Sequence, residues 1–349
     1  MTSTRATLLQ VAERAGVSLA STSRALHGTG ASKEMVERVR AAAEELGYSP
    51  DAIGRSLRMK KTFQIAFAVA DIGNPVYVEM LRAIHEVLDP HGYRVVVMST
   101  GDTAMSTGEL VRSLSSGFVD GMIVVPLRTD DELVREIRQA PVPVVVIGRA
   151  MDDQGISSVS TDSAAGIGEA VRHVYSLGRR RIVFLNGPRE TTPGAARQRG
   201  FDAAIAAEGF AAERVETETV NDFTVAAGLA AARRLLARAS GPADRFDAVV
   251  AANDLLAIGA IRAVRELGLS VPEDVAVTGM DDTEIGQVFL PSLTSVSLGS
   301  AERGRAAARL MLGLADDPDQ PSRQVAVGPT LMVRESTVPA SSVGTGKGA

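Results

Sequence analysis

The chain contains 349 residues, of which 45% are hydrophobic and 23% are charged, a composition typical of a globular protein with two or three domains. It contains no cysteine, so a disulfide framework, a cysteine-ligated zinc site and a thiol nucleophile are excluded. No apolar stretch has the length of a signal-peptide core or a membrane span, and we therefore expect a cytoplasmic protein with no membrane partner.

The N-terminal segment predicts two short helices joined by a tight turn. Thr7 and Gln10 have the spacing of a capping box, and Gly16 can adopt the positive φ that the turn requires. Ser18 is a suitable N-cap for the second helix, 19–26, whose early positions are small, hydroxyl-bearing or basic. Two helices across a short glycine turn form a helix-turn-helix, which places its second helix in the major groove of DNA. The alternative is an ordinary amphipathic helix pair that has no nucleic-acid partner.

The distribution of charge supports the first interpretation. The net charge of −5 argues by itself against a nucleic-acid binder, but residues 1–61 hold ten Lys and Arg against six Asp and Glu. The rest of the chain holds 27 against 36. A basic head on an acidic body is the pattern expected when only the head contacts DNA.

A third helix follows, with Ser32 as its N-cap and Gly47 at its end, and we expect it to pack behind the first two. The next segment, 48–61, is short, basic and poor in core residues, so it cannot form a stable helix alone. It is either a plain basic linker or a segment that becomes ordered on a partner.

These motifs resemble those of the LacI/GalR family of bacterial transcription regulators. The resemblance is carried by T-L-x-x-V-A-x-x-A-G-V-S at 7–18, S-R at 23–24, E-L-G-Y-S-P at 45–50 and R-S-L at 55–57, and it continues along nearly the whole chain. It implies that the segment after the third helix is a hinge that becomes helical only on DNA and inserts a leucine into the minor groove. Leu57 stands at that position, flanked by Arg55 and Arg58.

Gly54 departs from the alanine common at its position in this family. The glycine lowers the stability of a hinge helix by about 1 kcal/mol, or it allows two hinge helices to approach closely. We expect Leu19 and Ala20 to contact thymine methyl groups and Arg24 to contact a guanine. The expected DNA-binding residues are Thr7, Ser18, Leu19, Ala20, Ser21, Ser23, Arg24, His27, Arg55, Leu57 and Arg58.

From residue 64 the chain alternates between apolar strands and amphipathic helices, which predicts an α/β fold with two successive doubly wound parallel sheets. The predicted strands are 65–70, 95–99, 121–126, 144–147, 182–185, 215–220, 248–251 and 275–278. The predicted helices are 75–88, 106–116, 130–139, 164–177, 194–207, 225–239 and 255–267. The last elements, strand 293–297, helix 302–314 and strands 323–327 and 330–334, are expected to cross back and complete both sheets.

The resemblance implies that these units form a two-lobed, periplasmic-binding-protein-like core behind a three-helix helix-turn-helix domain. We expect a head and hinge at 1–61, a first lobe at 62–158 with 291–321, and a second lobe at 159–290 with 322–339. The Gly- and Ser-rich tail, 340–349, is expected to be disordered. It lacks a heptad helix, so we expect a homodimer rather than a tetramer held by a helical bundle.

Ligands of doubly wound sheets bind outside the carboxyl ends of the strands, which face each other across the cleft between two lobes. The polar or aromatic residues that follow strands are Asp71, Asn74 to Tyr77, Arg149, Asp162, Arg197, Asp222, Phe223, Asn253, Asp254, Asp281 and Asp282. Asp162, Asp254 and Asp282 are equally suited to capping the helices that follow them.

The resemblance narrows this set. Arg197 matches the family's ligand-binding arginine, and Asn253 and Asp281 match its other polar ligand contacts. Val76, Tyr77 and Phe223 match positions that line the pocket. Arg149 departs from relatives with an acidic residue at or near its position, which leaves the ligand's charge open, because Arg149 with Arg197 would suit an anionic or phosphorylated effector.

Enzymatic motifs are missing from the sequence. There is no P-loop and no G-x-S-x-G nucleophile elbow, and the glycines at 166 and 168 lack the third glycine of a dinucleotide fingerprint. The four histidines, His27, His85, His91 and His173, have no metal-site spacing, so we expect neither a metal nor a cofactor.

We therefore expect a DNA-binding regulator, acting as a repressor, whose affinity for a near-palindromic double-stranded operator is controlled by a sugar or sugar derivative. By analogy alone, ligand binding is expected to release DNA. The alternative is a two-lobed solute-binding protein or sugar-handling enzyme with no regulatory role on DNA.

Overall fold

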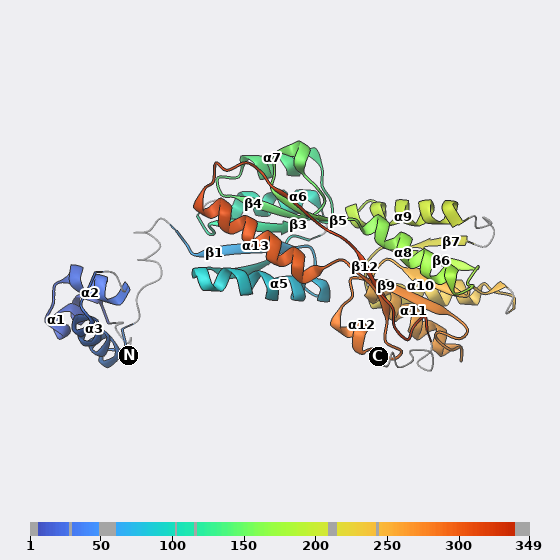
Figure 1. The fold of residues 1–349 in the computed structure, drawn as a ribbon, viewed down its shortest axis with the longest axis horizontal. Coiled ribbons are helices and arrows are strands. Elements are labelled where there is room, and N and C mark those ends of the chain that lie inside the picture. The colour runs from blue at the N-terminus through green and yellow to red at the C-terminus, as the bar shows by residue number, and fades with distance from the viewer. Residues whose placement is uncertain are drawn as a thin grey trace, which may run out of the picture. The chain divides into compact units, whose positions relative to one another are not determined.

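The computed structural model describes residues 6–27, 30–48, 61–101, 103–114, 117–208, 215–241 and 244–338. The chain divides into two compact units, Met1–Thr62 and Phe63–Ala349 (Figure 1). The predicted hinge contacts Arg55, Leu57 and Arg58, together with Gly54, lie outside the described residues, as do the tail 340–349 and the side chain of His27.

The first unit holds three short helices, α1 (Leu8–Ala15), α2 (Leu19–His27) and α3 (Lys33–Glu45). The predicted capping box is present at the start of α1. The Gln10 N–H donates to Thr7 Oγ1 at 3.3 Å, and the Thr7 N–H donates to Gln10 Oε1 at 2.8 Å. Two of the four free N–H groups of the helix end are satisfied in this way.

The turn and the packing of this unit also agree with the prediction. Gly16 adopts φ 64° after α1, and Ser18 Oγ accepts a hydrogen bond at 3.2 Å from the backbone N–H three residues later. Val11, Ala25 and Val39, one from each helix, are fully buried against one another. The third helix therefore completes a small apolar core behind the helix-turn-helix.

The second unit contains two sheets of six strands. The first sheet consists of β1 (Gln64–Val69), β2 (Arg94–Ser99), β3 (Gly121–Val125), β4 (Val144–Gly148), β5 (Ser158–Thr161) and β11 (Gln324–Val327). Its strand order is β11-β5-β4-β3-β1-β2, and all its pairs are parallel. Helices α5 (Pro75–Leu88) and α13 (Ser300–Asp316) pack together on one face, and α6 (Ala104–Leu114) and α7 (Asp131–Gln139) on the other (Figure 1). Two short 3₁₀ helices, η1 (Asp89–His91) and η2 (Asp152–Gln154), lie in connections.

The second sheet consists of β6 (Ile182–Asn186), β7 (Val215–Thr219), β8 (Ala248–Ala251), β9 (Ala276–Met280), β10 (Thr294–Ser297) and β12 (Thr330–Met332). Its order is β12-β10-β9-β8-β6-β7, and only β12 is antiparallel to its neighbour. Helices α8 (Ser163–Ser176) and α9 (Thr192–Glu208) pack as one pair, α10 (Val225–Ala237) and α11 (Asp254–Glu266) as another, and the short α12 (Glu284–Val288) follows β9. Each sheet with its helices is called a lobe below.

The predicted α/β class and both parallel sheets are confirmed, and the C-terminal elements do complete both sheets. Besides the two 3₁₀ helices, β5 and α12 were not predicted, because β5 is a short Ser- and Thr-rich strand and α12 has only five residues. The structure differs from the expected lobe boundaries at three places. The chain stays in the first sheet through β5, and β10 belongs to the second sheet. It returns to the first sheet only in β11, where Gln324 pairs with Ser158.

The physical reason for this difference is that these strands have only four residues each: β5 and β10 pair with the preceding strands β4 and β9, whereas β11 pairs with β5, far from it in the sequence. Neither their composition nor their length says which sheet they join. The result is three crossings between the lobes, after β5, after β10 and after β11.

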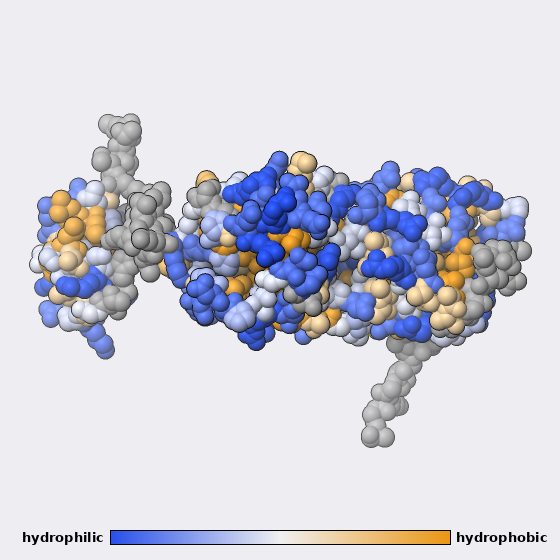
Figure 2. All heavy atoms as spheres, turned by 90° about the horizontal axis from the view of Figure 1, so that it is seen from above, coloured by the Kyte–Doolittle hydropathy of each residue, from blue (hydrophilic) through white to orange (hydrophobic). Residues whose placement is uncertain are grey.

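Apolar residues of the second unit are concentrated inside the lobes, and the face seen in Figure 2 is mainly hydrophilic with small apolar areas. None of the helices in the described ranges combines the length and the apolar character that a membrane crossing needs.

Candidate functional site

The second unit contains a cavity of ≈ 700 Å³ lined by residues from both lobes. The three crossings contribute to its wall through Thr161 and Asp162, Leu298, and Gly328. The cavity thus lies where the carboxyl ends of the parallel strands meet, which is the place that doubly wound sheets offer for ligands.

The structure brings all seven predicted ligand residues to this cavity. They are Val76, Tyr77, Arg149, Arg197, Phe223, Asn253 and Asp281. From the wider set of residues after strands, Asn74 and Asp162 also line the cavity, whereas Asp71, Asp222, Asp254 and Asp282 do not.

Most of the wider set serves local structure. Asn74 Oδ1 caps α5 by accepting the Val76 N–H at 3.2 Å, and Asp162 Oδ1 caps α8 at 2.9 Å. Asp71 accepts a hydrogen bond from a backbone N–H two residues later at 2.8 Å, and Asp222 accepts one from the next residue at 2.7 Å. Asp71 and Asp222 therefore shape their own turns and are not part of the cavity wall.

Arg197 and Asp281 form a buried ion pair in the cavity. Arg197 Nη2 lies 3.7 Å from Asp281 Oδ1, and the two side chains are 9% and 8% exposed. Burial lowers the pKa of Arg197, and the Asp281 carboxylate opposes this shift. Burial likewise raises the pKa of Asp281, and Arg197 and Arg303 oppose that shift. The pair offers donors and acceptors side by side, an arrangement suited to neighbouring hydroxyl groups of a ligand.

The backbone after β9 is unusual at the same place. Asp281 and Asp282 adopt φ values of 106° and 55°, in the left-handed region that residues other than glycine rarely occupy. The Asp281 N–H donates to Val296 O of β10 at 2.9 Å, which fixes the turn against the neighbouring strand. Strained turns of this kind persist where the surroundings hold them, often at functional sites.

Phe223 forms an aromatic wall of the cavity and is held from two sides. The Arg197 guanidinium carbon lies 5.7 Å from its ring centre. Gly187 leaves room for the ring, because a Cβ there would lie 2.3 Å from two ring carbons. Asn253 Nδ2 donates to Phe223 O at 3.1 Å, while Asn253 Oδ1 caps α11 by accepting the Leu256 N–H at 2.9 Å. Asn253 therefore lines the cavity and also positions the segment that carries the ring.

Tyr77 provides a second ring from the first lobe. Its ring packs edge-on against Phe67, with 6.5 Å between ring centres. Burial, followed by the nearby Asp281 carboxylate, raises the pKa of the Tyr77 hydroxyl to about 12. The hydroxyl therefore stays neutral at physiological pH, where it can both donate and accept hydrogen bonds.

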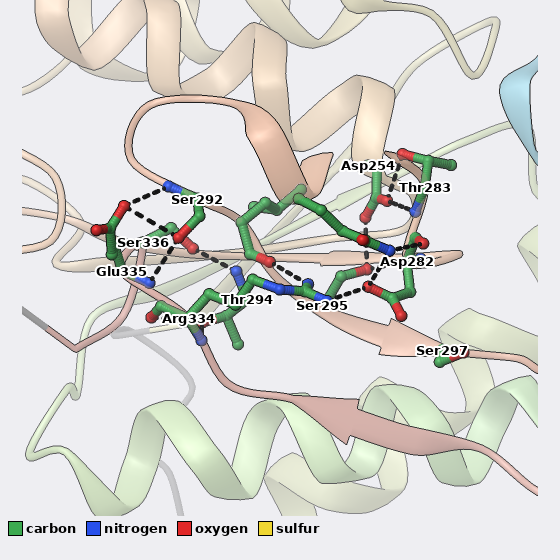
Figure 3. A network of polar contacts seen from close by, with 12 residues as sticks. Asp254, Asp282, Thr283, Ser292, Thr294, Ser295, Ser297, Arg334, Glu335 and Ser336 are labelled. Carbon is green, nitrogen blue, oxygen red and sulfur yellow. Dashed lines mark hydrogen bonds and ion pairs between the residues drawn. The ribbon is translucent and has the colours of Figure 1, made fainter. Parts of the chain in front are cut away.

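Asp254 and Asp282 belong to a different network, drawn in Figure 3. Asp254 Oδ2 accepts hydrogen bonds from the N–H and the hydroxyl of Thr283, both at 2.7 Å, and Asp254 Oδ1 accepts one from Ser295 Oγ at 2.5 Å. Asp282 Oδ1 lies 2.6 Å from Arg334 Nη2. These contacts join the start of α11, the turn after β9, β10 and the C-terminal segment, so both aspartates act structurally.

Arg303 was missed by the sequence analysis. It lies in the first turn of α13, lines the cavity and is 5% exposed. Burial lowers its pKa to about 10; Asp281 opposes the shift and Arg197 adds to it. Its position shortly after β10 could have identified it. Ligand-binding residues are expected after the carboxyl ends of strands, and this holds also where the chain leaves a strand to cross to the other lobe.

In the first unit, one face of α2 is open to solvent. Leu19 is 48% exposed, and Ala20 and Arg24 are exposed beside it, while Thr22 and Ala25 face the core. A leucine this exposed does not contribute to the core of the head. It is available for apolar contact with a partner, such as the methyl group of thymine.

Two of the hydroxyl residues expected to bind DNA, Thr7 and Ser18, lie at helix N-termini. Thr7 caps α1, and Ser18 caps α2 and donates its hydroxyl hydrogen to Ser21 Oγ at 2.9 Å. Arg24 Nη2 donates to Ser21 Oγ at 3.4 Å, and Ser23 is half-buried. Backbone N–H groups at helix N-termini favour phosphate groups, so the starts of α1 and α2 are suited to contacts with a nucleic-acid backbone.

Within the described ranges, no group of three or more His, Asp or Glu side chains is arranged to hold a metal ion. His173, one of the four histidines, lies with its Nε2 2.8 Å from Thr337 Oγ1. This histidine therefore contributes to the packing of α8 against the C-terminal segment.

Two family models match the chain. The model described as bacterial regulatory proteins of the lacI family matches residues 7–51, which include α1, α2 and α3. The model described as a periplasmic binding protein-like domain matches residues 171–337.

Full-length relatives are also found. The HTH-type transcriptional regulator CelR of Thermobifida fusca is 34% identical over 342 residues, covering 95% of this chain and 98% of CelR. The ribose operon repressor of Halalkalibacterium halodurans is 30% identical over 334 residues, covering 95% and 97%. Both relatives are transcriptional regulators and not enzymes.

Solved structures that match nearly the whole chain are also found. The Lac repressor dimer bound to operator and an anti-inducer matches with a TM-score of 0.83 at 26% identity, covering 96% of this chain and 99% of that chain. A complex of CelR with cellobiose matches with a TM-score of 0.69 at 32% identity, covering 95% and 100%. With its helix-turn-helix head and its hollow two-lobed unit, the chain is a DNA-binding transcriptional regulator and belongs to the LacI family of bacterial regulatory proteins.

Proposed function

We propose that the chain is a repressor that binds a near-palindromic operator as a homodimer and responds to a small carbohydrate in the cavity. The observation that carries this proposal is the presence, in one chain, of an exposed helix face suited to base contact and a cavity lined by all seven predicted ligand residues. The relatives also support a carbohydrate effector, since one is a ribose operon repressor and another is a regulator whose structure was solved with cellobiose.

On DNA, each protomer places α2 in a major groove, and the two copies read successive grooves. Leu19 and Ala20 contact thymine methyl groups and Arg24 contacts a guanine. Arg55, Leu57 and Arg58 act in the minor groove as a hinge, a role proposed from the sequence because they lie outside the described residues.

In the cavity, the Arg197–Asp281 pair binds ring hydroxyls, and Tyr77 and Phe223 contact the ring face. Val76 adds apolar surface, and Arg149 lies exposed at the cavity. A volume of ≈ 700 Å³ falls within the range of cavities that enclose small ligands.

A ligand in the cavity would contact the segments that connect the lobes, because residues of all three crossings line the cavity. A ligand that contacts both lobes binds one relative orientation of them better than another, and it shifts the population by that difference in affinity. We propose that this shift changes the spacing of the two hinge segments and releases the operator.

Exposed apolar side chains support the dimer. Ile285 and Val288 of α12 are 46% and 72% exposed, and Leu290 is 71% exposed shortly after this helix. Such side chains are commonly covered by a partner. The relative solved on operator DNA is a dimer.

We also propose that the protein acts in the bacterial cytoplasm, where the DNA that it regulates lies.

Selection of duplexes from a random library tests the DNA-binding function. Fragments retained by the full-length protein should converge on one near-palindromic sequence. Protein that lacks residues 1–62 but keeps the compact second unit should retain no preferred sequence. Lack of convergence with the full-length protein, or the same convergence without the head, would contradict the proposal.

A further inference from the structure

The cavity of the second unit carries more positive than negative side chains. Four arginines line it, Arg149, Arg197, Arg199 and Arg303, against the two carboxylates of Asp162 and Asp281. Arg197 and Arg303 are buried, whereas Arg149 and Arg199 are exposed.

Both carboxylates already have partners. Asp162 Oδ1 caps α8 at 2.9 Å, and Asp281 pairs with Arg197 at 3.7 Å. Arg303, by contrast, has no ion pair within 4.0 Å among the described residues, and its Nη2 donates a hydrogen bond to Ser300 Oγ at 3.4 Å. Arg303 is therefore a buried cation in excess of the Arg197–Asp281 pair.

The hydrogen-bonding capacity of both buried guanidiniums is also incomplete. Neither Arg197 Nε nor Arg303 Nε has a partner among the described residues. The hydroxyl oxygens of Thr129 and Thr161, two further lining residues, are unpartnered as well. Buried donors without partners cost free energy, and a buried cation without a counter-charge costs more.

Two other carboxylates act on these cations and do not remove the excess. The Asp254 charge acts on Arg197, but Asp254 does not line the cavity, and its oxygens accept hydrogen bonds from Thr283 and Ser295. Burial raises the pKa of Asp254 to about 7, so near neutral pH it carries only part of a negative charge. Glu79 acts weakly on Arg303, but it is exposed to solvent, which screens its charge.

We propose that the effector is an anionic sugar, whose carboxylate or phosphate group binds to Arg303 together with Arg197. Guanidinium groups match the planar geometry of carboxylate and phosphate oxygens and form charge-assisted hydrogen bonds with them. The inference rests on the proposed function, because it concerns the same cavity and the same response to a ligand.

A neutral sugar would explain only part of the site. The Arg197–Asp281 pair suits hydroxyl groups, but a neutral ligand would leave the Arg303 charge buried and uncompensated. The anion is assigned to Arg303 because this residue supplies the charge that the protein does not balance.

Calorimetric titration of the full-length protein with inorganic phosphate at constant ionic strength tests the proposal. Phosphate should bind the wild-type protein at a site that Arg303→Met weakens by about tenfold or more. Arg303→Lys, which keeps the charge but not the fork of donors, should lie between the two. Arg305→Met is the matched control on the same helix, since Arg305 pairs with Glu86 at 3.1 Å on the surface, and it should bind as the wild type does.

Competition with bound phosphate separates the two kinds of anion. Displacement by sugar phosphates but not by sugar acids would assign a phosphate, and the reverse would assign a carboxylate. No phosphate binding beyond chloride, equal binding by Arg303→Met, or displacement by neutral sugars as strong as by charged ones would overturn the proposal. Operator binding by the unliganded protein is measured in parallel. If the unliganded protein does not bind its operator, the proposed function is wrong. If it binds the operator but responds to a neutral sugar, only the proposal of an anionic effector is wrong.

Discussion

Arg24 is the residue of α2 best placed to read a base. Its side chain is exposed beside Leu19 and Ala20, and among the described residues its guanidinium makes one hydrogen bond, to Ser21 Oγ at 3.4 Å. Arg24→Ala should weaken operator binding by roughly 1–3 kcal/mol and relax one base position. Gel shifts on the selected operator and its single-base variants measure both effects.

Arg14→Ala is the matched control for that experiment. Arg14 pairs with Glu45 at 2.6 Å, so the side chain is already engaged within the head. Its removal should leave base preference unchanged. An equal loss of affinity on random DNA in the Arg24 variant would show that this arginine contacts phosphate and not a base.

Asp254 gives a second prediction for a single residue. Burial, and then the Asp281 charge, raises its pKa to about 7, above a value of about 3.9 in the unfolded chain. The folded state therefore holds this proton more tightly, so its contribution to stability is present below about pH 4 and is lost as pH rises toward 7. Within that window, the free energy of unfolding should fall by at most about 1.4 kcal/mol per pH unit because of Asp254.

Asp254→Asn should remove this part of the pH dependence, measured by urea denaturation between pH 4.5 and 8. Asp162→Asn is the control, since asparagine also caps helices and Asp254 is still present in that variant. If wild-type protein and Asp254→Asn lost stability in parallel across the window, the assignment to Asp254 would be wrong.

Position after a strand gave a set of candidates, and the family resemblance singled out Arg197, Phe223 and Asp281 from it; all three line the cavity on which the strand ends of both sheets converge. The same rule could not exclude Asp254. Its side chain is turned away by hydrogen bonds from Thr283 and Ser295, which are far from it in sequence. The direction in which a side chain points depends on such tertiary contacts.

Helices α10 and α11 pack closely because glycines meet at their contact. A Cβ at Gly259 would lie 2.3 Å from Val225 O, and one at Gly228 would lie 2.4 Å from Leu256 O. Gly259→Ala should therefore lower the free energy of unfolding by about 1–3 kcal/mol, the usual cost of overpacking. Gly241→Ala, where a Cβ meets nothing within 4 Å, should change it little. Equal effects of both substitutions in thermal unfolding would contradict this explanation.

The short helix α12 gives a prediction about assembly. Val288 is 72% exposed at its end, and we expect a partner protomer to cover it. Val288→Asp should shift the protein toward monomer in sedimentation velocity and weaken operator binding. Leu267→Asp, on a leucine 58% exposed at the end of α11, should leave the dimer intact. A Val288→Asp protein that sediments as the wild type does would exclude α12 from the interface.

Long elements were predictable because their periodicity is strong. Helix 75–88 was predicted with its observed bounds, since Asn74 caps it and Pro75 begins it. The five-residue α12 and the strand β5 lack such signals, and their existence depends on the neighbouring strands and turns.

At the scale of the whole molecule, the α/β class and the two sheets followed from the alternation of strands and helices. The sheet membership of β5, β10 and β11 did not follow. β5 and β10 continue their sheets beside the preceding strands β4 and β9, whereas β11 pairs with β5, which lies far from it in the sequence, and no pattern in such short strands separates the two cases. The cavity depends on these crossings, since their residues line it, and so its charge could not be read fully from the order of elements.

We infer that the basic head binds a specific DNA sequence and that the acidic second unit binds the effector that controls this binding. Fluorescence anisotropy with the selected operator and a scrambled duplex of equal length, at moderate salt, measures the affinity of the protein for both duplexes, with and without effector. The dissociation constant should be about 10³-fold or more lower for the operator, and the effector should reduce that ratio. Equal dissociation constants for the two duplexes, with and without effector, would contradict sequence-specific control of transcription by this protein.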